Sequence, residues 1–318
     1  MRSKHVVVSI NLDQVRASAD QIRRQTRVAL IAVIKADAYG LGATKVADAL
    51  AGVADDFAYF SIHEAREVGR PGIVLGPPEG EPAEYRELHL RPSIATHEQA
   101  EKFAGLPVAI NVDTGMQRFG CEPHELDDLC RRSVVSEVVT HAVDVDSARR
   151  LRSLCPPGRY RLHAAATSLL GFPEAWLDAV RPGLALYRGA VRVSARLYLV
   201  RHANGKAGYT RFECPHVGLI LAGYSNGLSP GPVLVNGRRQ RLLEAGMNTS
   251  FVSVDPGDQA GDEVVLLGDG LNEAELARHF NVREHEILCR YTAMGVRQYI
   301  GGSAEAESAL HSECMARP

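Results

Sequence analysis

The chain has 318 residues, of which 45% are hydrophobic and 23% are charged, and its formal net charge is −2. This length is enough for one large domain or two smaller ones. The charge balance excludes the basic excess of a nucleic-acid-binding protein, and no apolar run is long enough to cross a membrane. Six cysteines have no paired spacing, which argues against a disulfide framework and predicts a cytoplasmic protein. They are Cys121, Cys130, Cys155, Cys214, Cys289 and Cys314.

The N-terminal apolar run is followed directly by Asn11 and Asp13, so it is too short for a signal peptide and predicts a strand over residues 5–11. A helix is predicted over residues 13–26. The next run, VALIAVIK, is short, continuous and apolar until it ends at Lys35, which is typical of a buried strand. Lys35 then either extends its amine to water or, if desolvated, forms a Schiff base with an aldehyde cofactor.

Predicted strands then alternate with helical segments as far as residue 189. The strands are expected at 28–35, 57–62, 72–76, 90–95, 107–113, 138–145, 160–167 and 180–189. This alternation predicts a closed (β/α)8 barrel over residues 10–191, with its active site at the carboxyl ends of the strands. Roughly 180 residues is small for that fold, so an open doubly wound sheet is the alternative. No glycine-rich dinucleotide fingerprint follows any strand.

The pattern changes near residue 192, where short apolar runs are separated by glycine, asparagine and aspartate turns. One further helix is predicted over residues 271–280. Together these features predict a second, mainly β domain over residues 192–318. The N-terminal strand, residues 5–11, has no partner in the barrel and is a candidate to pair with this domain.

Ionisable side chains recur where the predicted barrel strands end. They are Lys35, Asp113, Arg118, His141, His163 and Arg181. Taken singly, a histidine on an apolar strand is more often a hydrogen-bonded core residue, and an arginine before Pro-Gly is more often a turn anchor. Side chains at the carboxyl rim of one barrel converge, however. Such a set suits an anionic aldehyde cofactor better than a metal, because no H-E-x-x-H spacing occurs.

These segments resemble, in order, those of the alanine racemases, which are fold-type III pyridoxal-phosphate enzymes. IAVIKADAYGLG resembles the family's cofactor-lysine signature, and NVDTGMQRFG resembles its D-T-G-M-x-R-x-G segment. VTHAVDVD, LHAAATS and VRPGLALYRG resemble segments that line the cofactor. AGYTRF, LEAGMNTSFVSVDPG and HEILCRYTAMGVRQY resemble parts of the C-terminal domain. The resemblance covers nearly the whole chain and implies a (β/α)8 barrel followed by a β domain.

The resemblance also implies a pyridoxal-phosphate-dependent racemase that interconverts L-alanine and D-alanine. Lys35 would hold the cofactor and act as one base, and Tyr209 of the partner subunit in a head-to-tail homodimer would be the other. Arg181 would face the pyridine nitrogen, with His141 and His163 supporting Arg181 and the second base. The cofactor phosphate would be held by Tyr39, Thr167, Gly183, Leu184 and His285. Arg118 and the backbone near Met247 would orient the substrate carboxylate.

The chemistry explains these residue types. Racemisation removes a proton from one face of Cα and returns one to the other face, so it needs two proton-transfer groups, and an amine and a phenol can serve. The cofactor is the electron sink. An arginine does not readily give up a proton, so Arg181 would leave the pyridine nitrogen neutral and limit transamination.

Several residues differ from those usual in the family. They are Asn111, Ala166, Asn226, Leu228, Asn248 and His285. Asn111 stands where the family often has a carbamylated lysine, which removes an anionic partner of Arg118. These differences leave the substrate range open, so a racemase of other or more amino acids is the first alternative. A non-catalytic pyridoxal-phosphate carrier is the second, and the predicted β domain with Tyr209 argues against it.

Overall fold

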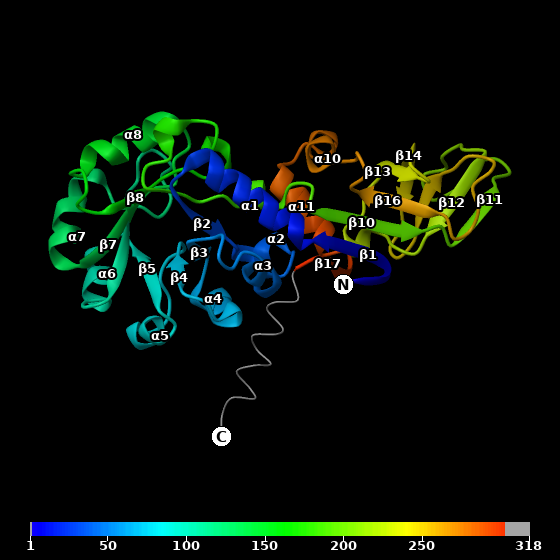
Figure 1. Cartoon of the computed structure of the whole chain (residues 1–318). Helices are drawn as coiled ribbons and strands as arrows, with labels where there is room; N and C mark the ends of the chain where they lie inside the picture. The colour runs from blue at the N-terminus through cyan, green and yellow to red at the C-terminus, as the bar shows by residue number, and fades with distance from the viewer. Residues whose placement is uncertain (1, 303–318) are drawn as a thin grey trace, which may run out of the picture. The chain divides into compact units, whose positions relative to one another are not determined.

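The structure, a computed structural model, describes residues 2–302, which form two compact units (Figure 1). The barrel unit comprises residues 15–38 and 42–186, and the sheet unit comprises residues 2–14, 39–41 and 187–302. Residues 303–318, which include Cys314 and the end of the predicted second domain, lie outside the described residues.

The barrel unit is built on parallel strands that follow one another around a closed barrel in sequence order. They are β2 (Ala29–Val33), β3 (Asp56–Tyr59), β4 (Gly72–Val74), β5 (Leu90–Ile94), β6 (Pro107–Asn111), β7 (Val134–Val139), β8 (Arg161–His163) and β9 (Ala179–Val180). The last strand returns to the first, because Ala29 pairs with Ala179 and Leu30 with Val180. This closure confirms the predicted barrel and excludes the open sheet.

Short helices connect the strands and cover the barrel. They are α1 (Leu12–Thr26), α3 (Ala43–Ala49), α4 (Ile62–Val68), α5 (Pro82–Glu87), α6 (His97–Lys102), α7 (Leu126–Arg132), α8 (Val145–Leu154) and α9 (Leu184–Tyr187), with 3-10 turns η1 (Pro123–Glu125), η2 (Thr167–Leu169) and η3 (Pro173–Ala175). Several begin at a side-chain cap: Ser61 accepts from the backbone N–H of Glu64, and Thr96 from that of Gln99. Such caps satisfy N–H groups that the first helical turn leaves unpaired. Helices of six or seven residues explain how so short a chain closes a barrel.

Several predicted elements of the barrel were wrong in extent, position or type. The strand expected at 160–167 is only β8 (Arg161–His163), and the strand expected at 180–189 is only β9 (Ala179–Val180), because residues 184–187 form α9. The strand expected at 138–145 is β7 (Val134–Val139), and residues 140–144 form the loop after it. Asp144 must leave the strand because its carboxylate accepts from Ser147 N at 2.7 Å and so caps α8. The helical segment expected between the last two strands is a single turn, η3, and the backbone at Leu177, with φ 54°, ends it before β9 begins.

The sheet unit has one mixed sheet in the order β11-β12-β15-β14-β13-β16-β10-β1-β17. Its strands are β1 (Ser3–Asn11), β10 (Val191–Arg196), β11 (Leu199–His202), β12 (His216–Ile220), β13 (Gly231–Val235), β14 (Arg238–Ala245), β15 (Ser250–Ser253), β16 (Glu263–Leu267) and β17 (Gly295–Ile300). β1 pairs antiparallel with β10 and parallel with β17.

Two helices accompany this sheet, α10 (Glu273–Phe280) and α11 (Glu284–Thr292). The second was not predicted. It buries Ile287, Leu288 and Tyr291 and contacts β10 and β17. The 3-10 turn η4 (Tyr224–Asn226) lies between β12 and β13.

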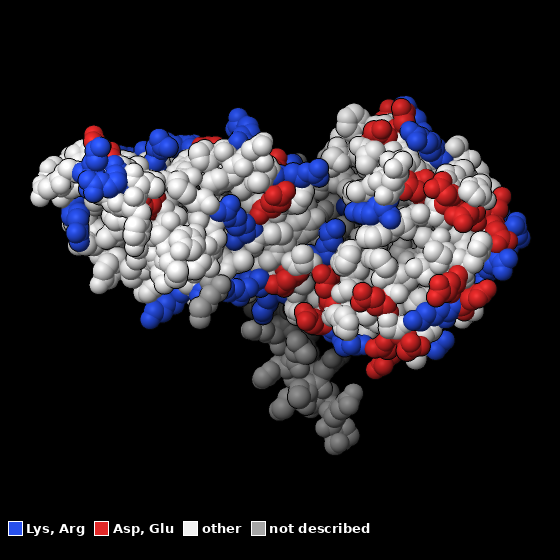
Figure 2. All heavy atoms as spheres, turned by 180° about the vertical axis from the view of Figure 1, so that it is seen from behind, with Lys and Arg blue, Asp and Glu red and all other residues white. Residues whose placement is uncertain are grey.

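The surface charges and the cysteines give little information about function. Basic and acidic side chains are interspersed on the face shown in Figure 2. Within residues 2–302, no helix has both the length and the apolar character needed to cross a membrane. The cysteines of the same range, at positions 121, 130, 155, 214 and 289, are thiols.

Candidate active site

Lys35 follows β2 and begins an unusual backbone turn, α2 (Lys35–Tyr39). Ala36, Asp37, Ala38 and Tyr39 have φ values of 53°, 54°, 52° and 59°, all in the left-handed region. That region costs a residue with a side chain roughly 1–2 kcal/mol. Such strain persists only where surrounding contacts impose it, and it concentrates at functional sites.

Acidic side chains hold this turn in place. Glu64 Oε1 accepts from Ala36 N at 2.8 Å, and its Oε2 accepts from Phe60 N at 2.6 Å. Asp37 Oδ1 accepts from Ala43 N at 2.7 Å. Glu64 therefore fixes the peptide next to Lys35, and the sequence interpretation did not include it. Its signal was weak, because it also reads as an ordinary acidic residue in the first turn of α4.

A chain of buried side chains starts at Arg181, which is 4% exposed. Its Nη1 lies 2.5 Å from His163 Nδ1, and its Nη2 donates to the carbonyl of Thr140 at 2.5 Å. His163 Nε2 lies 2.9 Å from Glu137 Oε2, and both side chains are almost completely buried. The predicted support of Arg181 by His163 is thus a direct contact.

The chemistry of the donors fixes the histidine tautomer. A guanidinium group can only donate, so His163 Nδ1 must accept and the ring proton must lie on Nε2, which donates to Glu137. Burial, together with the charge of Arg181, lowers the pKa of His163 to about 4 and keeps the ring neutral. Burial opposes ionisation of Glu137, but its contacts with His163 and Arg91 lower its pKa to about 2.

The chain of contacts continues away from Arg181. Glu137 Oε1 accepts from Arg91 Nε at 2.7 Å, Arg91 also bonds Asp56, and Arg161 Nη1 lies 3.6 Å from Asp56 Oδ2. Asp56 and Arg161 are the first residues of β3 and β8, whereas Arg181 follows the last residue of β9. This chain of hydrogen bonds and ion pairs therefore runs between the two ends of the barrel. Glu137 was missed, although a lone carboxylate in the apolar strand VVSEVV was a visible signal.

The pKa of His141 responds to the charges of three other predicted site residues. Its pKa is lowered to about 4, first by burial and then by the charges of Arg181, Arg118 and Lys35. Asn111, Arg118 and His141 also line one small cleft. Three cations acting on one histidine make this part of the barrel unit strongly attractive to an anion.

Thr167 lies at the start of η2, next to the segment that leads into α9. Its Oγ1 accepts from Gly183 N at 3.4 Å and from Ala185 N at 3.1 Å. The hydroxyl of Thr167 therefore links η2 to the backbone turn of Gly183 and Leu184 that leads into α9. Successive N–H groups at such a turn are typical of phosphate-binding loops.

The remaining predicted site residues belong to the sheet unit. The ring of Tyr39 lies 5.2 Å from that of Tyr187, and burial raises the pKa of Tyr39 to about 12. His285 is half-buried in α11, and the side chains of Tyr209 and Met247 are 93% and 59% exposed.

Two of the residues that differ from the family have clear local roles. Leu228 is buried at 2% exposure, and Asn248 is exposed with its Oδ1 accepting from Ser225 Oγ at 2.9 Å.

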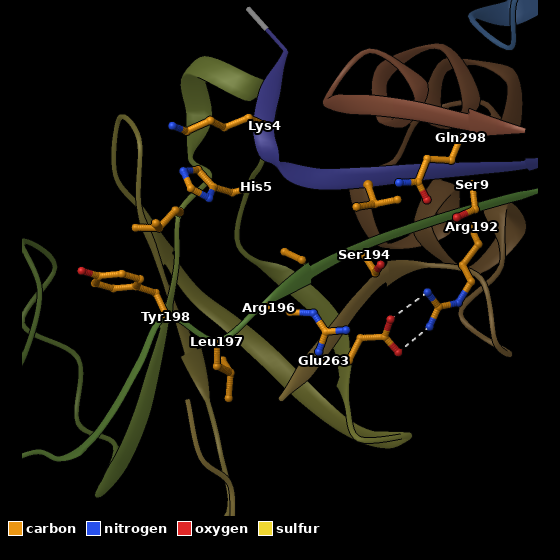
Figure 3. Close-up of a pocket in the computed structure, with 13 residues that line it drawn as sticks. Lys4, His5, Ser9, Arg192, Ser194, Arg196, Leu197, Tyr198, Glu263 and Gln298 are labelled. Atoms are coloured by element: carbon orange, nitrogen blue, oxygen red, sulfur yellow. Dashed lines mark hydrogen bonds and ion pairs between the residues drawn. The ribbon is translucent and has the colours of Figure 1, made fainter. Parts of the chain in front are cut away.

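A cavity of about 610 Å³ lies on the sheet unit and includes none of the predicted site residues (Figure 3). Its lining includes Lys4, His5, Tyr198 and an ion pair in which Arg192 binds both oxygens of Glu263, at 2.9 and 2.6 Å. Perturbed, buried ionisable groups locate a reaction site better than cavity size does. The connected set of such groups, Glu137, His163 and Arg181, is in the barrel unit.

Comparisons with known proteins find relatives over most of the chain. Residues 10–191 match the family model described as alanine racemase, N-terminal domain, and residues 200–299 match alanine racemase, C-terminal domain. The alanine racemase of Nitrosococcus oceani is 30% identical in an alignment that covers 89% of this chain and 94% of that protein.

Solved structures show the same fold. The biosynthetic alanine racemase of Pseudomonas aeruginosa is 28% identical, with a TM-score of 0.83 over 94% of this chain and 100% of that one. The alanine racemase of Bartonella henselae with covalently bound pyridoxal phosphate is 22% identical, with a TM-score of 0.82 over the same shares.

Proposed function

The chain belongs to the alanine racemase family and is an isomerase, and we propose that it holds pyridoxal phosphate on Lys35 and interconverts L-alanine and D-alanine. The observation that carries the proposal is the buried contact of Arg181 with His163, at 2.5 Å, together with a cleft lined by Arg118 and His141. The charge of Lys35 also lowers the pKa of His141. An amine, a hydroxyl beside backbone N–H groups and a buried cation are the groups that an anionic aldehyde cofactor requires.

Arg181 fits the pyridine nitrogen of that cofactor. The acceptors described for its guanidinium are neutral: His163 Nδ1 and the carbonyls of His163 and Thr140. Burial lowers the pKa of Arg181 to about 10, so the group remains charged at neutral pH. A cation that keeps its proton would leave the pyridine nitrogen unprotonated.

Other residues would bind the phosphate. The groups that would do so are Thr167, the backbone of Gly183 and Leu184, Tyr39 and His285. When bound, pyridoxal phosphate supplies the electron sink that makes the Cα proton of an amino acid removable. We assign the cofactor-binding domain to residues 10–191 and the β domain to residues 192–318, with strand 5–11 joining the latter.

Racemisation would use Lys35 Nζ on one face of the substrate and the phenol of Tyr209 of the partner subunit on the other. The 93% exposure of Tyr209 supports this proposal, because a side chain so exposed in its own chain is free to serve another. Arg118 and the backbone at Met247 would orient the substrate carboxylate. The functional assembly would then be a homodimer with shared active sites.

The test uses purified protein loaded with pyridoxal phosphate. We expect visible absorbance of the bound cofactor, conversion of L-alanine to D-alanine, and exchange of the Cα proton in deuterated water. Lys35→Ala should abolish all three, whereas Lys45→Ala, on the exposed side of α3, should change none. Wild-type protein that binds the cofactor but exchanges no Cα proton would contradict the proposal.

The same exchange assay across a panel of L-amino acids separates an alanine-selective enzyme from a broader racemase. A dilution series that compares activity with oligomeric state tests the shared site. Activity that persists in the monomer would contradict it.

A further inference from the structure

A buried carboxylate, Glu244, holds the loop that carries Tyr209. Glu244 lies on β14 and is 5% exposed. Its Oε1 accepts from the backbone N–H of Tyr209 at 3.0 Å. Its Oε2 accepts from Thr210 N at 2.6 Å and from Thr210 Oγ1 at 2.7 Å.

These donors replace the cation that a buried carboxylate usually needs. Within residues 2–302, no ion pair of Glu244 is found. Burial favours the neutral acid, but the hydrogen bonds from Thr210 and Tyr209 outweigh it and lower the pKa of Glu244. A carboxylate in this setting is satisfied only while the loop keeps its conformation, because leaving it unpaired in the core is costly.

The loop is shaped to fit around the carboxylate. Gly208 has φ +68°, and a Cβ on it would lie 2.7 Å from Oε2 of Glu244 and 2.8 Å from Oε1. Only glycine allows so close an approach of the backbone in that conformation. The loop is closed by a hydrogen bond from Ala207 N to Phe212 O at 2.9 Å.

The neighbouring strand supports the same loop. Phe251 on β15 lies opposite Glu244 in the sheet register, and its ring packs edge-on against Phe212 with 5.3 Å between centroids. Two adjacent residues of the sheet thus fix the loop, one through its polar backbone and one through an aromatic ring. Fixing the peptides on both sides of Tyr209 fixes the direction of its Cα–Cβ bond.

We propose that Glu244 is a positioning residue for proton transfer by Tyr209. The proposal rests on the proposed function, in which Tyr209 of the partner subunit is one of two bases. Glu244 does not touch the substrate. It sets where the phenol of Tyr209 points, and a displacement of about 1 Å in a catalytic group can slow a reaction roughly 100-fold.

The test measures racemisation of L-alanine and D-alanine, each with hydrogen or deuterium at Cα, by the cofactor-loaded enzyme. Each direction begins with proton removal by a different base. If Tyr209 alone is misplaced, the primary isotope effect should rise in the direction that begins with Tyr209 and fall in the other. A general loss of folded enzyme lowers both rates and leaves both isotope effects unchanged, so the pair of isotope effects separates positioning from structure.

We expect Glu244→Gln to lower kcat/KM by about 100-fold and to move the two isotope effects in opposite directions. Thr210→Val, which removes one of the three hydrogen bonds, should shift them in the same sense but less, and it decides the matter if Glu244→Gln does not fold. Glu263→Gln removes a carboxylate from β16 of the same sheet and should leave both isotope effects unchanged.

Wild-type isotope effects in both directions for Glu244→Gln and Thr210→Val would overturn the inference. Tyr209→Phe separates it from the proposed function. If Tyr209→Phe racemises alanine at the wild-type rate, the two-base assignment fails; if it is inactive while the Glu244 and Thr210 variants keep wild-type isotope effects, the inference alone fails.

Discussion

Removal of the Glu137 carboxylate should destabilise the barrel unit more than removal of an exposed carboxylate. Glu137 is 1% exposed and bonds His163 at 2.9 Å and Arg91 at 2.7 Å. Glu137→Ala leaves an arginine and the Nε2–H of a neutral histidine facing an apolar gap. Breaking a buried ion pair by deleting one partner costs about 3–5 kcal/mol.

Glu137→Gln distinguishes charge from hydrogen bonding. The amide can still accept from His163 Nε2 but offers Arg91 no negative charge, so the expected loss is smaller, about 1–3 kcal/mol. The matched control is Asp48→Ala, which breaks a half-exposed ion pair with Arg70 in the same unit. Pairs of that kind contribute about 0–1 kcal/mol.

The assay is urea denaturation followed by fluorescence of Trp176, the chain's one tryptophan, which lies in the barrel unit. The free energy of unfolding should fall in the order wild type and Asp48→Ala, then Glu137→Gln, then Glu137→Ala. If Glu137→Ala loses no more free energy than Asp48→Ala, Glu137 does not hold the buried chain together and the reasoning is refuted.

Three further predictions concern stability in acid, the packing of Gly40 and the hydroxyl of Thr167. Burial and nearby cations lower the pKa values of His141 and His163 from 6.5 to about 4. Their contribution to the free energy of unfolding is therefore full above pH 6.5 and is lost as the pH falls toward 4. Urea midpoints should decline over that window, and a flat profile would contradict this. Gly40→Ala should lower the melting temperature more than Gly52→Ala, since both have positive φ but a Cβ at Gly40 would meet a threonine hydroxyl at 2.1 Å and one at Gly52 would meet nothing within 4 Å; equal losses would show that contact is not decisive. Thr167→Val leaves two backbone N–H groups without their acceptor and should weaken pyridoxal-phosphate binding by roughly tenfold in equilibrium titrations, whereas unchanged affinity would remove Thr167 from the phosphate site.

The fold was predictable because the spacing of apolar residues along the chain indicates where strands and helices alternate. Continuous apolar runs such as the one before Lys35 alternate with polar helical segments, and the register from Ala29 to Ala179 closes the barrel. The errors in the predicted elements arose at the ends of helices. The carboxylate of Asp144 caps a helix, so the chain leaves β7 earlier than its apolar pattern suggests. Helix α11 lacks a side-chain N-cap, so its first residue could not be recognised from the sequence.

The candidate site was predictable in its residue types but not in its connections. The ends of the predicted strands identify Lys35, His163 and Arg181 as candidate site residues. The roles of these residues in activity stay predictions. Nothing local requires residues 36–39 to be left-handed, because none is glycine and the turn is imposed by distant partners such as Glu64. A sequence shows single carboxylates, but it does not show which cations or N–H groups they meet.

The chain of hydrogen bonds and ion pairs from Arg181 to Asp56 also constrains how this barrel can change over evolutionary time. Each member satisfies its neighbour, so the effects of single substitutions are not additive, and replacing one residue leaves another charge or donor stranded. A route from this arrangement to an apolar barrel core passes through intermediates less stable than either end. Replacements at Glu137 and Arg91 should therefore be tolerated together more readily than separately, and this pair is expected to diverge in concert among related sequences.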